Sequence, residues 1–303
     1  MMRKSPMKQE SRQPISGVDF EQYFQPKSLK KALEIKAEYQ DQIEVAAGST
    51  DLLVANYEKL HEIKNWLDLD KLDELRKIEV KDNKLHIGAM ATHLQLMKSD
   101  LVKEKLAVLA AAAEDVGSPQ IRSRGTIGGN ICTSSPAGDL LAPLLSYEAS
   151  FKLQTAETER IVAAEKFFTG PKRNLMEADE LLTEIIIPLT ENEREGTWIK
   201  VGRRKALVIS TLTLSVVLEF EAGKIVKAGV AMGSVAPTPI RLGEVEEMML
   251  GNKLSELDYK KLDQEVKARI NTIDDLRGTK EYREDVAADV MVRALNEIER
   301  KRG

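Results

Sequence analysis

Gln120-Ile121-Arg122-Ser123-Arg124-Gly125-Thr126-Ile127-Gly128-Gly129-Asn130 is the stretch from which the fold of this chain is most directly predicted. Three glycines lie close together in it, with a hydroxyl and an amide side chain beside them. Glycine has no Cβ, so such a segment lets backbone amides come close to an anion or to the edge of a ring. The spacing matches neither the dinucleotide fingerprint G-x-G-x-x-G nor the P-loop, so neither of those folds is predicted.

A second glycine-containing turn, Ala46-Ala47-Gly48-Ser49-Thr50-Asp51-Leu52-Leu53, follows a predicted buried strand at residues 43–47. Its small side chains allow consecutive N–H groups to converge on an anion, and Ser49 and Thr50 add hydroxyl donors. The alternative is a glycine that only ends a strand. Taken alone, this turn does not decide between the two interpretations.

Length and composition bound the possible functions. A chain of 303 residues with 42% hydrophobic and 31% charged residues predicts two globular domains. The formal charge of −4, with both signs interspersed, gives no basic stripe for nucleic acid. The single cysteine, Cys132, excludes an internal disulfide and a chain-internal iron–sulfur cluster; we interpret it as a small buried apolar residue.

The amino-terminal residues 1–17 are polar and lack the apolar stretch of a signal peptide, so we expect a disordered leader there. No run of about 18 apolar residues occurs, so no membrane span is predicted. These two features together predict a cytoplasmic protein.

The first half of the chain alternates short helices and strands. The patterns predict strands at 43–47, 63–69, 76–80, 84–89, 149–154 and 181–187, and helices at 29–39, 92–98 and 101–116. Asp82-Asn83 suits a hairpin turn, and Gly117 ends the alanine-rich helix. Residues 117–138 are expected to form an ordered functional loop, after which Asp139 caps a helix at 140–147.

A polar segment at 190–196 is the predicted linker between a first domain, 18–190, and a second, 197–303. The second domain is expected to hold strands at 197–201, 207–221 and 224–235, with a hairpin at Ala222-Gly223. Helices are expected at 241–250, 255–270 and 281–301. The last of these shows an apolar face that we interpret as core packing, formed by Tyr282, Val286, Val290, Ala294 and Ile298.

Both turns together resemble motifs of the FAD-binding (medium) subunits of the molybdenum hydroxylase family, which includes xanthine, carbon monoxide and nicotinate dehydrogenases. The family's A-G-G-T-D-L-L resembles residues 47–53, and its Q-I-R-N-x-G-T-I-G-G-N followed by S-P-x-G-D resembles residues 120–130 and 135–139. The resemblance continues through Lys200-Val201-Gly202-Arg203-Arg204 to the last helix, and so covers about residues 18 to 300.

The resemblance implies an α+β fold. Its first part would be an FAD-binding domain of two subdomains, of the p-cresol methylhydroxylase and vanillyl-alcohol oxidase type. A carbon monoxide dehydrogenase flavoprotein-like domain would follow, with an antiparallel sheet and three helices. The implied cofactor-binding residues are Ala46, Ala47, Gly48, Ser49, Thr50, Asp51, Thr92, Gly117, Gly125, Thr126, Gly128, Gly129, Asn130, Asp139, Leu182 and Lys200.

Two positions depart from the family pattern. Ser49 stands where the family has a second glycine, and a positive φ there would strain serine by about a kilocalorie or more. Ser123 stands where many relatives carry Asn.

Three further positions have alternative interpretations. Lys200 is the candidate for tuning the flavin potential, the alternative being a solvated lysine at a strand end. The Arg203-Arg204-Lys205 run either docks a partner or an anionic acceptor, or is simply solvated. No metal role is expected for the scattered His61, His86 and His93.

The resemblance implies a subunit of an FAD-dependent oxidoreductase that transfers electrons and does not itself hydroxylate substrate. Electrons would come from [2Fe–2S] clusters on a small partner subunit, molybdenum-pterin would sit on a large one, and the acceptor would be NAD+ or another oxidant. Two alternatives stay open: a self-contained flavoprotein oxidase or dehydrogenase, and a flavin-free scaffold with the same fold.

Overall fold

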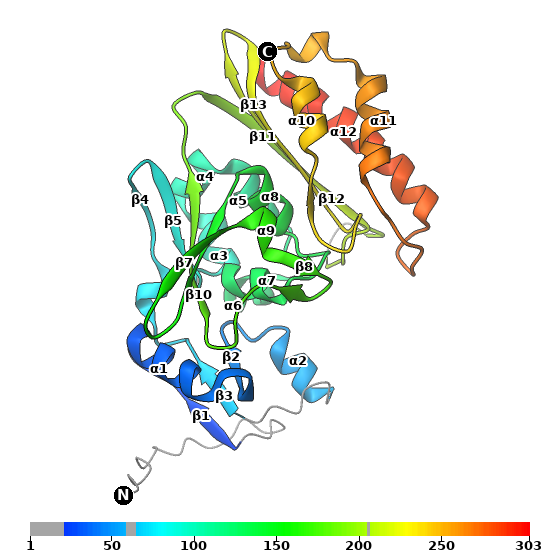
Figure 1. The fold of residues 1–303 in the computed structure, drawn as a ribbon. Helices are drawn as coiled ribbons and strands as arrows, with labels where there is room; N and C mark the ends of the chain where they lie inside the picture. Colours follow the sequence, from blue (N-terminus) through cyan, green and yellow to red (C-terminus); the bar gives the residue numbers. More distant parts are fainter. Residues whose placement is uncertain (1–20, 59–64, 205–206) are drawn as a thin grey trace, which may run out of the picture.

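The computed structural model describes residues 21–58, 65–204 and 207–303; the predicted leader, 1–17, lies outside them. Figure 1 shows a small α/β unit next to the amino terminus, a central sheet with its helices, and a carboxy-terminal sheet covered by helices. The predicted α+β class, with a first part of two subdomains and an antiparallel second part, is confirmed.

The amino-terminal unit is a parallel three-stranded sheet in the order β1-β3-β2. Its elements are β1 (Gln22–Phe24), α1 (Leu29–Tyr39), β2 (Ile43–Ala46), α2 (Leu52–Tyr57) and β3 (Asn65–Asp68). The helix expected at 29–39 and the strand expected at 43–47 are confirmed. The first residues of the strand expected at 63–69 lie outside the described residues.

The central sheet is antiparallel, in the order β4-β5-β10-β6-β7. Its strands are β4 (Ile78–Lys81), β5 (Lys84–Gly88), β6 (Ser150–Gln154), β7 (Glu159–Ala163) and β10 (Leu181–Pro188). Asp82 and Asn83 both have positive φ, 49° and 54°, as the predicted hairpin turn requires. The sequence patterns missed β7 and the short α9 (Ala164–Phe167), β8 (Phe168–Gly170) and β9 (Arg173–Asn174).

Two predictions about the helices on this sheet are wrong. The single helix expected at 101–116 is two helices, α4 (Asp100–Lys105) and α5 (Ala107–Glu114). They are broken at Leu106, which takes φ −137° and is fully buried. Asp139 does not cap α8 (Leu141–Ser146), because its carboxylate pairs with Lys200.

The expected loop at 117–138 is also wrong, since most of it is helical. It forms α6 (Pro119–Arg124) and α7 (Ile127–Thr133). Another short helix of this part of the chain, α3 (His93–Lys98), lies earlier in the sequence, before α4 and α5. Ser118, Thr126 and Thr92 cap these helices through their hydroxyls. Glycines lower helix propensity, but the Thr126 cap and the burial of Ile127 and Ile131 outweigh Gly128 and Gly129 here.

The carboxy-terminal sheet is antiparallel, in the order β11-β12-β13-β14. It comprises β11 (Glu193–Val201), β12 (Leu212–Glu221), β13 (Lys224–Gly233) and β14 (Ile240–Arg241), with helices α10 (Gly243–Met249), α11 (Tyr259–Arg269) and α12 (Lys280–Arg302) beside it. The linker expected at 190–196 is wrong in part, because β11 begins at Glu193 and pairs with β12.

The apolar face expected on α12 is correct except at its start. Val290, Ala294 and Ile298 are buried, whereas Tyr282 is 48% exposed. The neighbouring Arg283 is buried instead.

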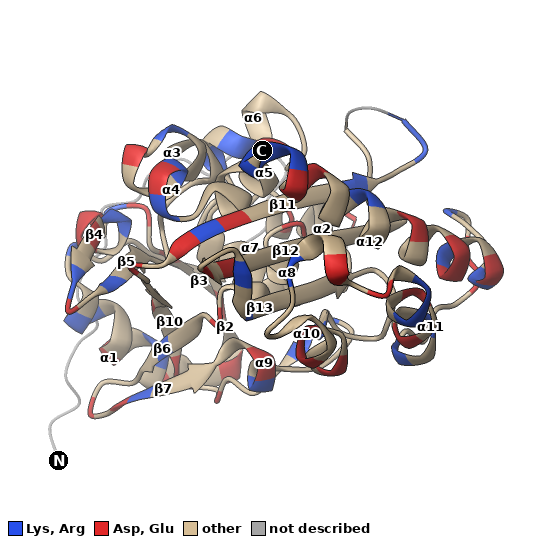
Figure 2. Cartoon of the chain, turned by 90° about the horizontal axis from the view of Figure 1, so that it is seen from above, with Lys and Arg blue, Asp and Glu red and all other residues tan. Residues whose placement is uncertain are grey.

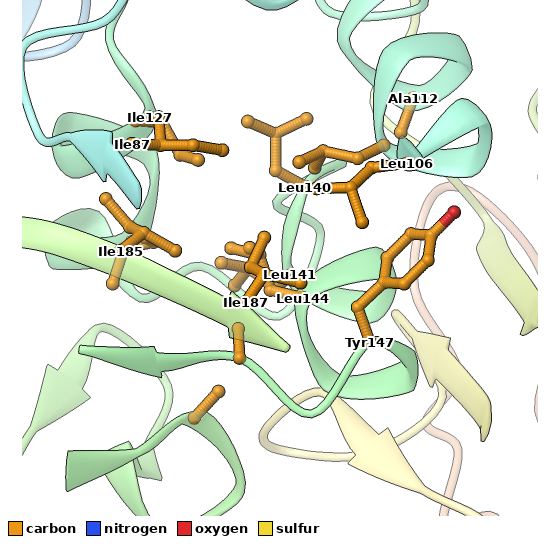
Figure 3. Packing of buried hydrophobic residues seen from close by; sticks show 14 of the residues in the cluster. Ile87, Leu106, Ala112, Ile127, Leu140, Leu141, Leu144, Tyr147, Ile185 and Ile187 are labelled. Carbon is orange, nitrogen blue, oxygen red and sulfur yellow. The ribbon is translucent and has the colours of Figure 1, made fainter. Parts of the chain in front are cut away.

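The main core lies between the central sheet and helices α3 to α8, where Ile87, Leu106, Ile127 and Ile185 meet (Figure 3). Val217 and Ala231 of the carboxy-terminal sheet belong to the same core. A Cβ on Gly229 of β13 would overlap the carbonyl group of Ser146 in α8. The two parts of the chain therefore pack at backbone distance.

Charged residues of both signs are interspersed over the helices and strands in Figure 2. In the part of the chain that the structure describes, no helix has the length and apolar character needed to cross a membrane.

Candidate functional site

The two glycine-containing turns touch each other. A Cβ on Gly48 would overlap the carbonyl oxygen of Arg124 and lie 2.7 Å from the Cα of Gly125. Real Cβ contacts are never this short, so only glycine allows the two backbones to meet. Residues 46–51 and 125–130, far apart in the sequence, thus form one site, which we call the double turn.

The first turn keeps its backbone donors open. Ser49 has φ +58°, the left-handed conformation that its place in the motif raised as a source of strain; for a residue with a Cβ this costs roughly 1–2 kcal/mol. Among residues 21–58, 65–204 and 207–303, no acceptor takes the N–H of Gly48, Ser49 or Thr50. Consecutive open amides around a left-handed residue are the arrangement that binds anions.

The second turn uses its donors internally. Ile127 and Gly128 donate to the carbonyl oxygens of Ala91 and Ala89, both at 2.9 Å. Gly129 donates to Thr126 Oγ1 at 3.0 Å. The second turn therefore offers a ligand close approach to its backbone and its side chains, whereas the first turn offers free amides. The sequence did not indicate this difference between the two turns.

The open side of the second turn lies at Gly129 and Asn130. A Cβ on Gly129 would meet only Thr126 Oγ1, at 3.1 Å, whereas one on Gly128 would lie 2.6 Å from the carbonyl oxygen of Ala89. Asn130 Oδ1 is buried without a hydrogen-bond partner among the described residues. A buried amide oxygen without a partner is costly unless a ligand or water satisfies it.

His93, for which the sequence raised only a metal-binding role, packs against the second turn. Its backbone N–H donates to Gly125 O at 3.0 Å, and a Cβ on Gly125 would lie 3.0 Å from the imidazole Cδ2. Burial, reinforced by the charge of Arg122, lowers the pKa of His93 to about 4, so the ring is neutral at pH 7. The feature of the sequence that could have indicated a role for His93 is its position directly after Thr92, a predicted cofactor-binding residue.

Thr92 lies in contact with the same turn. It pairs with Thr126 in an isolated antiparallel bridge, and both side chains are buried. Gly117 has φ +45° and is tied to α6, because Arg122 Nη1 donates to its carbonyl oxygen at 3.3 Å. Thr92 and Gly117 therefore both connect neighbouring segments to the helices that flank the second turn.

Asp139 and Lys200 form a buried ion pair between the two parts of the chain. Lys200 Nζ lies 2.7 Å from Asp139 Oδ2 and 3.0 Å from the carbonyl oxygen of Asp115. Only 8% of the Lys200 side chain is exposed, so the alternative of a solvated lysine is wrong.

The pKa of the Asp139 carboxyl lies close to neutral pH. Burial raises its pKa to about 6, against the opposing effect of Lys200. At pH 7 this carboxyl is therefore largely ionised. Asp139 Oδ1 is buried without a hydrogen-bond partner in the described part of the chain.

The other predicted residues differ in exposure, because Asp51 is exposed whereas Ala46 and Leu182 are buried. Ala46 and Leu182 are 4% and 5% exposed, and Leu182 belongs to the main core on β10. The Asp51 side chain caps no backbone group of α2. Cys132, predicted as a buried apolar residue, is only partly buried, and it packs against the main core. Its Sγ lies 3.7 Å from the sulfur of Met176, and burial raises the pKa of the thiol to about 12.

In residues 21–58, 65–204 and 207–303, no three His, Cys, Asp or Glu side chains are grouped so that they could hold a metal ion. The features that remain are open backbone amides, buried side-chain oxygens without partners and one buried ion pair. They suit an organic cofactor with a diphosphate and polar ring edges.

Two family models match consecutive parts of the chain. The family described as "FAD binding domain in molybdopterin dehydrogenase" matches residues 18–190, and "CO dehydrogenase flavoprotein C-terminal domain" matches 198–298. The nicotinate dehydrogenase FAD-subunit of Eubacterium barkeri is 34% identical over 242 residues, covering 78% of this chain and 81% of the relative. The xanthine dehydrogenase FAD-binding subunit of Escherichia coli O157:H7 is 30% identical, covering 88% of this chain and 91% of the relative.

Among solved structures, carbon monoxide dehydrogenase from Hydrogenophaga pseudoflava superposes with a TM-score of 0.88 at 29% identity, covering 94% of this chain and 98% of the matched one. The two family models and the fold thus define a flavoprotein subunit of an oxidoreductase. The chain belongs to the FAD-binding medium subunits of the molybdenum hydroxylase family, and it carries the family's FAD-binding domain.

Proposed function

We propose that the double turn holds FAD and that the chain relays electrons within a multi-subunit molybdenum hydroxylase. The observation that carries this proposal is the backbone contact of Gly48 with Arg124 and Gly125, beside the open N–H groups of residues 48–50. A diphosphate needs such donors, and an FAD bound there supplies the redox chemistry itself.

The residues present fit this cofactor. Gly48, Ser49 and Thr50 would donate to the diphosphate, with Ala46, Ala47 and Asp51 shaping their turn. On the other side of the double turn, Gly129 leaves room for the cofactor chain and Asn130 offers an unsatisfied oxygen. The remaining predicted contacts are Thr92, Gly117, Gly125, Thr126, Gly128, Asp139, Leu182 and Lys200.

Lys200 and Asp139 would orient and tune the flavin ring. A buried cation favours a nearby anionic reduced form, and Asp139 holds the Lys200 ammonium in place at 2.7 Å. Asp139 Oδ1, which lacks a partner in the described residues, can accept a hydrogen bond from a ring N–H.

The proposed partners are a small subunit with [2Fe–2S] clusters and a large subunit with molybdenum-pterin, and the proposed acceptor is NAD+ or another oxidant. The one cysteine of the sequence supports this, because such clusters need about four ligands. Relatives named "FAD-subunit" and "medium chain" are by those names parts of larger assemblies. We further propose that the two domains predicted at 18–190 and 197–303 are the two parts of the chain, with the second beginning at Glu193, the first residue of β11.

The test is the flavin content of the whole purified chain. We expect a yellow protein with about one FAD per chain, measured by absorption after denaturation. A colourless chain that takes up no added FAD would overturn the proposal in favour of the scaffold alternative. Flavin without any metal-containing partner, after isolation from the source cell, would favour the self-contained enzyme.

A further inference from the structure

One N–H of the Lys200 ammonium group is left without an acceptor. The group donates to Asp139 Oδ2 at 2.7 Å and to the carbonyl oxygen of Asp115 at 3.0 Å, and only 8% of the side chain is exposed. A lysine ammonium carries three N–H groups. No residue in 21–58, 65–204 and 207–303 accepts from the third, so that N–H is available to a ligand.

The second acceptor of Lys200 lies at the end of a helix. Asp115 is the C-cap of α5, with φ −83° and ψ −6°, and it comes two residues before Gly117, a predicted cofactor-binding position. The last carbonyl groups of a helix have no partner within the helix and carry partial negative charge, so they attract a cation. The end of α5 therefore stabilises the Lys200 ammonium group where it lies.

Trp198 ties the same residue to the carboxy-terminal sheet. Its indole Nε1 donates to Asp115 Oδ2 at 2.8 Å, and its ring packs against the main core. Trp198 and Lys200 are two positions apart on β11, so their side chains lie on the same face of the sheet. Asp115 thus accepts from both residues, with its carboxylate from Trp198 and with its backbone carbonyl from Lys200.

The negative charge of Asp115 also acts on the ion pair. Burial is the main cause of the raised pKa of Asp139, and the charge of Asp115 adds to it while Lys200 opposes it. Asp115 itself is exposed, and neither it nor Trp198 is among the predicted cofactor-binding residues. The contacts of Asp115 with Lys200 and Trp198 thus point to a role that the motifs did not indicate.

We propose that Asp115 and Trp198 are positioning residues for the flavin ring, because their hydrogen bond fixes the end of α5 against β11 and so fixes the Lys200 ammonium group with one N–H free. This inference rests on the proposed function, in which Lys200 tunes the ring. A cation held in one place stabilises negative charge on the reduced ring better than one that must first reorient. Loss of the Trp198–Asp115 hydrogen bond should therefore lower the flavin reduction potential.

The test is a redox titration of the FAD-loaded full chain against a dye of known potential, which gives the ratio of reduced to oxidised flavin. Trp198→Phe removes the indole donor, and Trp66→Phe is the matched control, since Trp66 Nε1 has no hydrogen-bond partner in the described residues. We expect Trp198→Phe to lower the ratio roughly threefold or more, as the loss of one charge-assisted hydrogen bond would, and Trp66→Phe to leave it unchanged.

A second matched pair of variants does not depend on the folding of Trp198→Phe. Asp115→Leu and Asp115→Asn both remove the charge, but only asparagine keeps an oxygen that can accept from Trp198. We expect Asp115→Leu to give a ratio roughly threefold lower than Asp115→Asn does. In a Lys200→Gln background the two variants should agree, and Trp198→Phe should have no further effect, because both residues act through Lys200.

Equal ratios for wild type and Trp198→Phe, together with equal ratios for Asp115→Leu and Asp115→Asn, would overturn the inference. Effects of the same size in the Lys200→Gln background would also overturn it, because Asp115 and Trp198 would then act without Lys200. A wild-type chain that binds no FAD would instead overturn the proposed function on which the inference rests.

Discussion

Gly48 is the residue on which the contact between the two turns depends. Any side chain at this position would meet the Arg124 carbonyl and the Gly125 backbone, neither of which can rotate away. We expect Gly48→Ala to reduce the free energy of unfolding by about 1–3 kcal/mol, as overpacking does, and to abolish FAD retention. Denaturant unfolding and flavin absorption measure the two effects, and wild-type values for both would contradict the contact.

The raised pKa of Asp139 predicts how the stability of the protein depends on pH. Its pKa is raised from 3.8 to about 6, so between these values the folded protein keeps a proton that the unfolded chain has released. The stability contributed by this group is present below about pH 4 and is lost as the pH rises through about 6.

We therefore expect the free energy of unfolding of wild type, relative to Asp139→Asn, to fall by about 1–3 kcal/mol between pH 4 and pH 6, since each pKa unit corresponds to about 1.4 kcal/mol. Urea unfolding of both proteins across this range measures the difference. A difference that stays constant with pH would contradict the raised pKa.

At the scale of elements, Arg283 links α12 to the segments before β12 and after β13, because its guanidinium donates to the carbonyl oxygens of Thr211 and Ser234 and to Asp275 Oδ1. Removing one partner of a buried, hydrogen-bonded charge costs about 3–5 kcal/mol. We expect Arg283→Met to lower the free energy of unfolding by that order. The control is Arg300→Met, since Arg300 is exposed on the same helix and donates only to Asn296 O within the described residues. Equal stability of the two variants would refute the structural role of Arg283.

The sequence predicts the regular elements well where one local signal dominates. The helix at 29–39 has a serine cap, and the hairpin at Asp82-Asn83 contains two residues that tolerate positive φ. Prediction from the sequence fails where tertiary contacts determine whether a segment is helical. Leu106 breaks a helix because its side chain is needed in the core, and Gly128 and Gly129 are helical because Ala89 and Thr126 take up their amides.

The resemblance of the motifs predicts which residues form the candidate site, but it does not predict how those residues are arranged in space. Nothing in the sequence shows that Gly48 meets Arg124, since this contact depends on how two distant segments pack. The internal use of the second turn's amides, the position of His93 and the burial of Lys200 are likewise tertiary facts. Their roles in binding FAD stay predictions.

At the scale of the whole molecule, the two parts of the chain share one core. Val217 and Ala231 join the main cluster, and Gly229 packs against the Ser146 carbonyl. We expect a single calorimetric unfolding transition with equal calorimetric and van't Hoff enthalpies. Gly229→Val should lower the transition temperature, whereas two separate transitions in wild type would contradict a shared core.

The most direct measurement is a titration of flavin-depleted chain with FAD, followed by flavin fluorescence, for wild type, Gly129→Val and Gly243→Val. A Cβ at position 129 meets only the Thr126 Oγ1, at 3.1 Å, and one at 243 meets nothing within 4 Å. Circular dichroism of both variants checks that they fold before FAD is added. We predict that Gly129→Val binds FAD at least tenfold more weakly, while Gly243→Val binds like wild type. Gly129→Val with wild-type affinity would contradict the placement of FAD at the double turn.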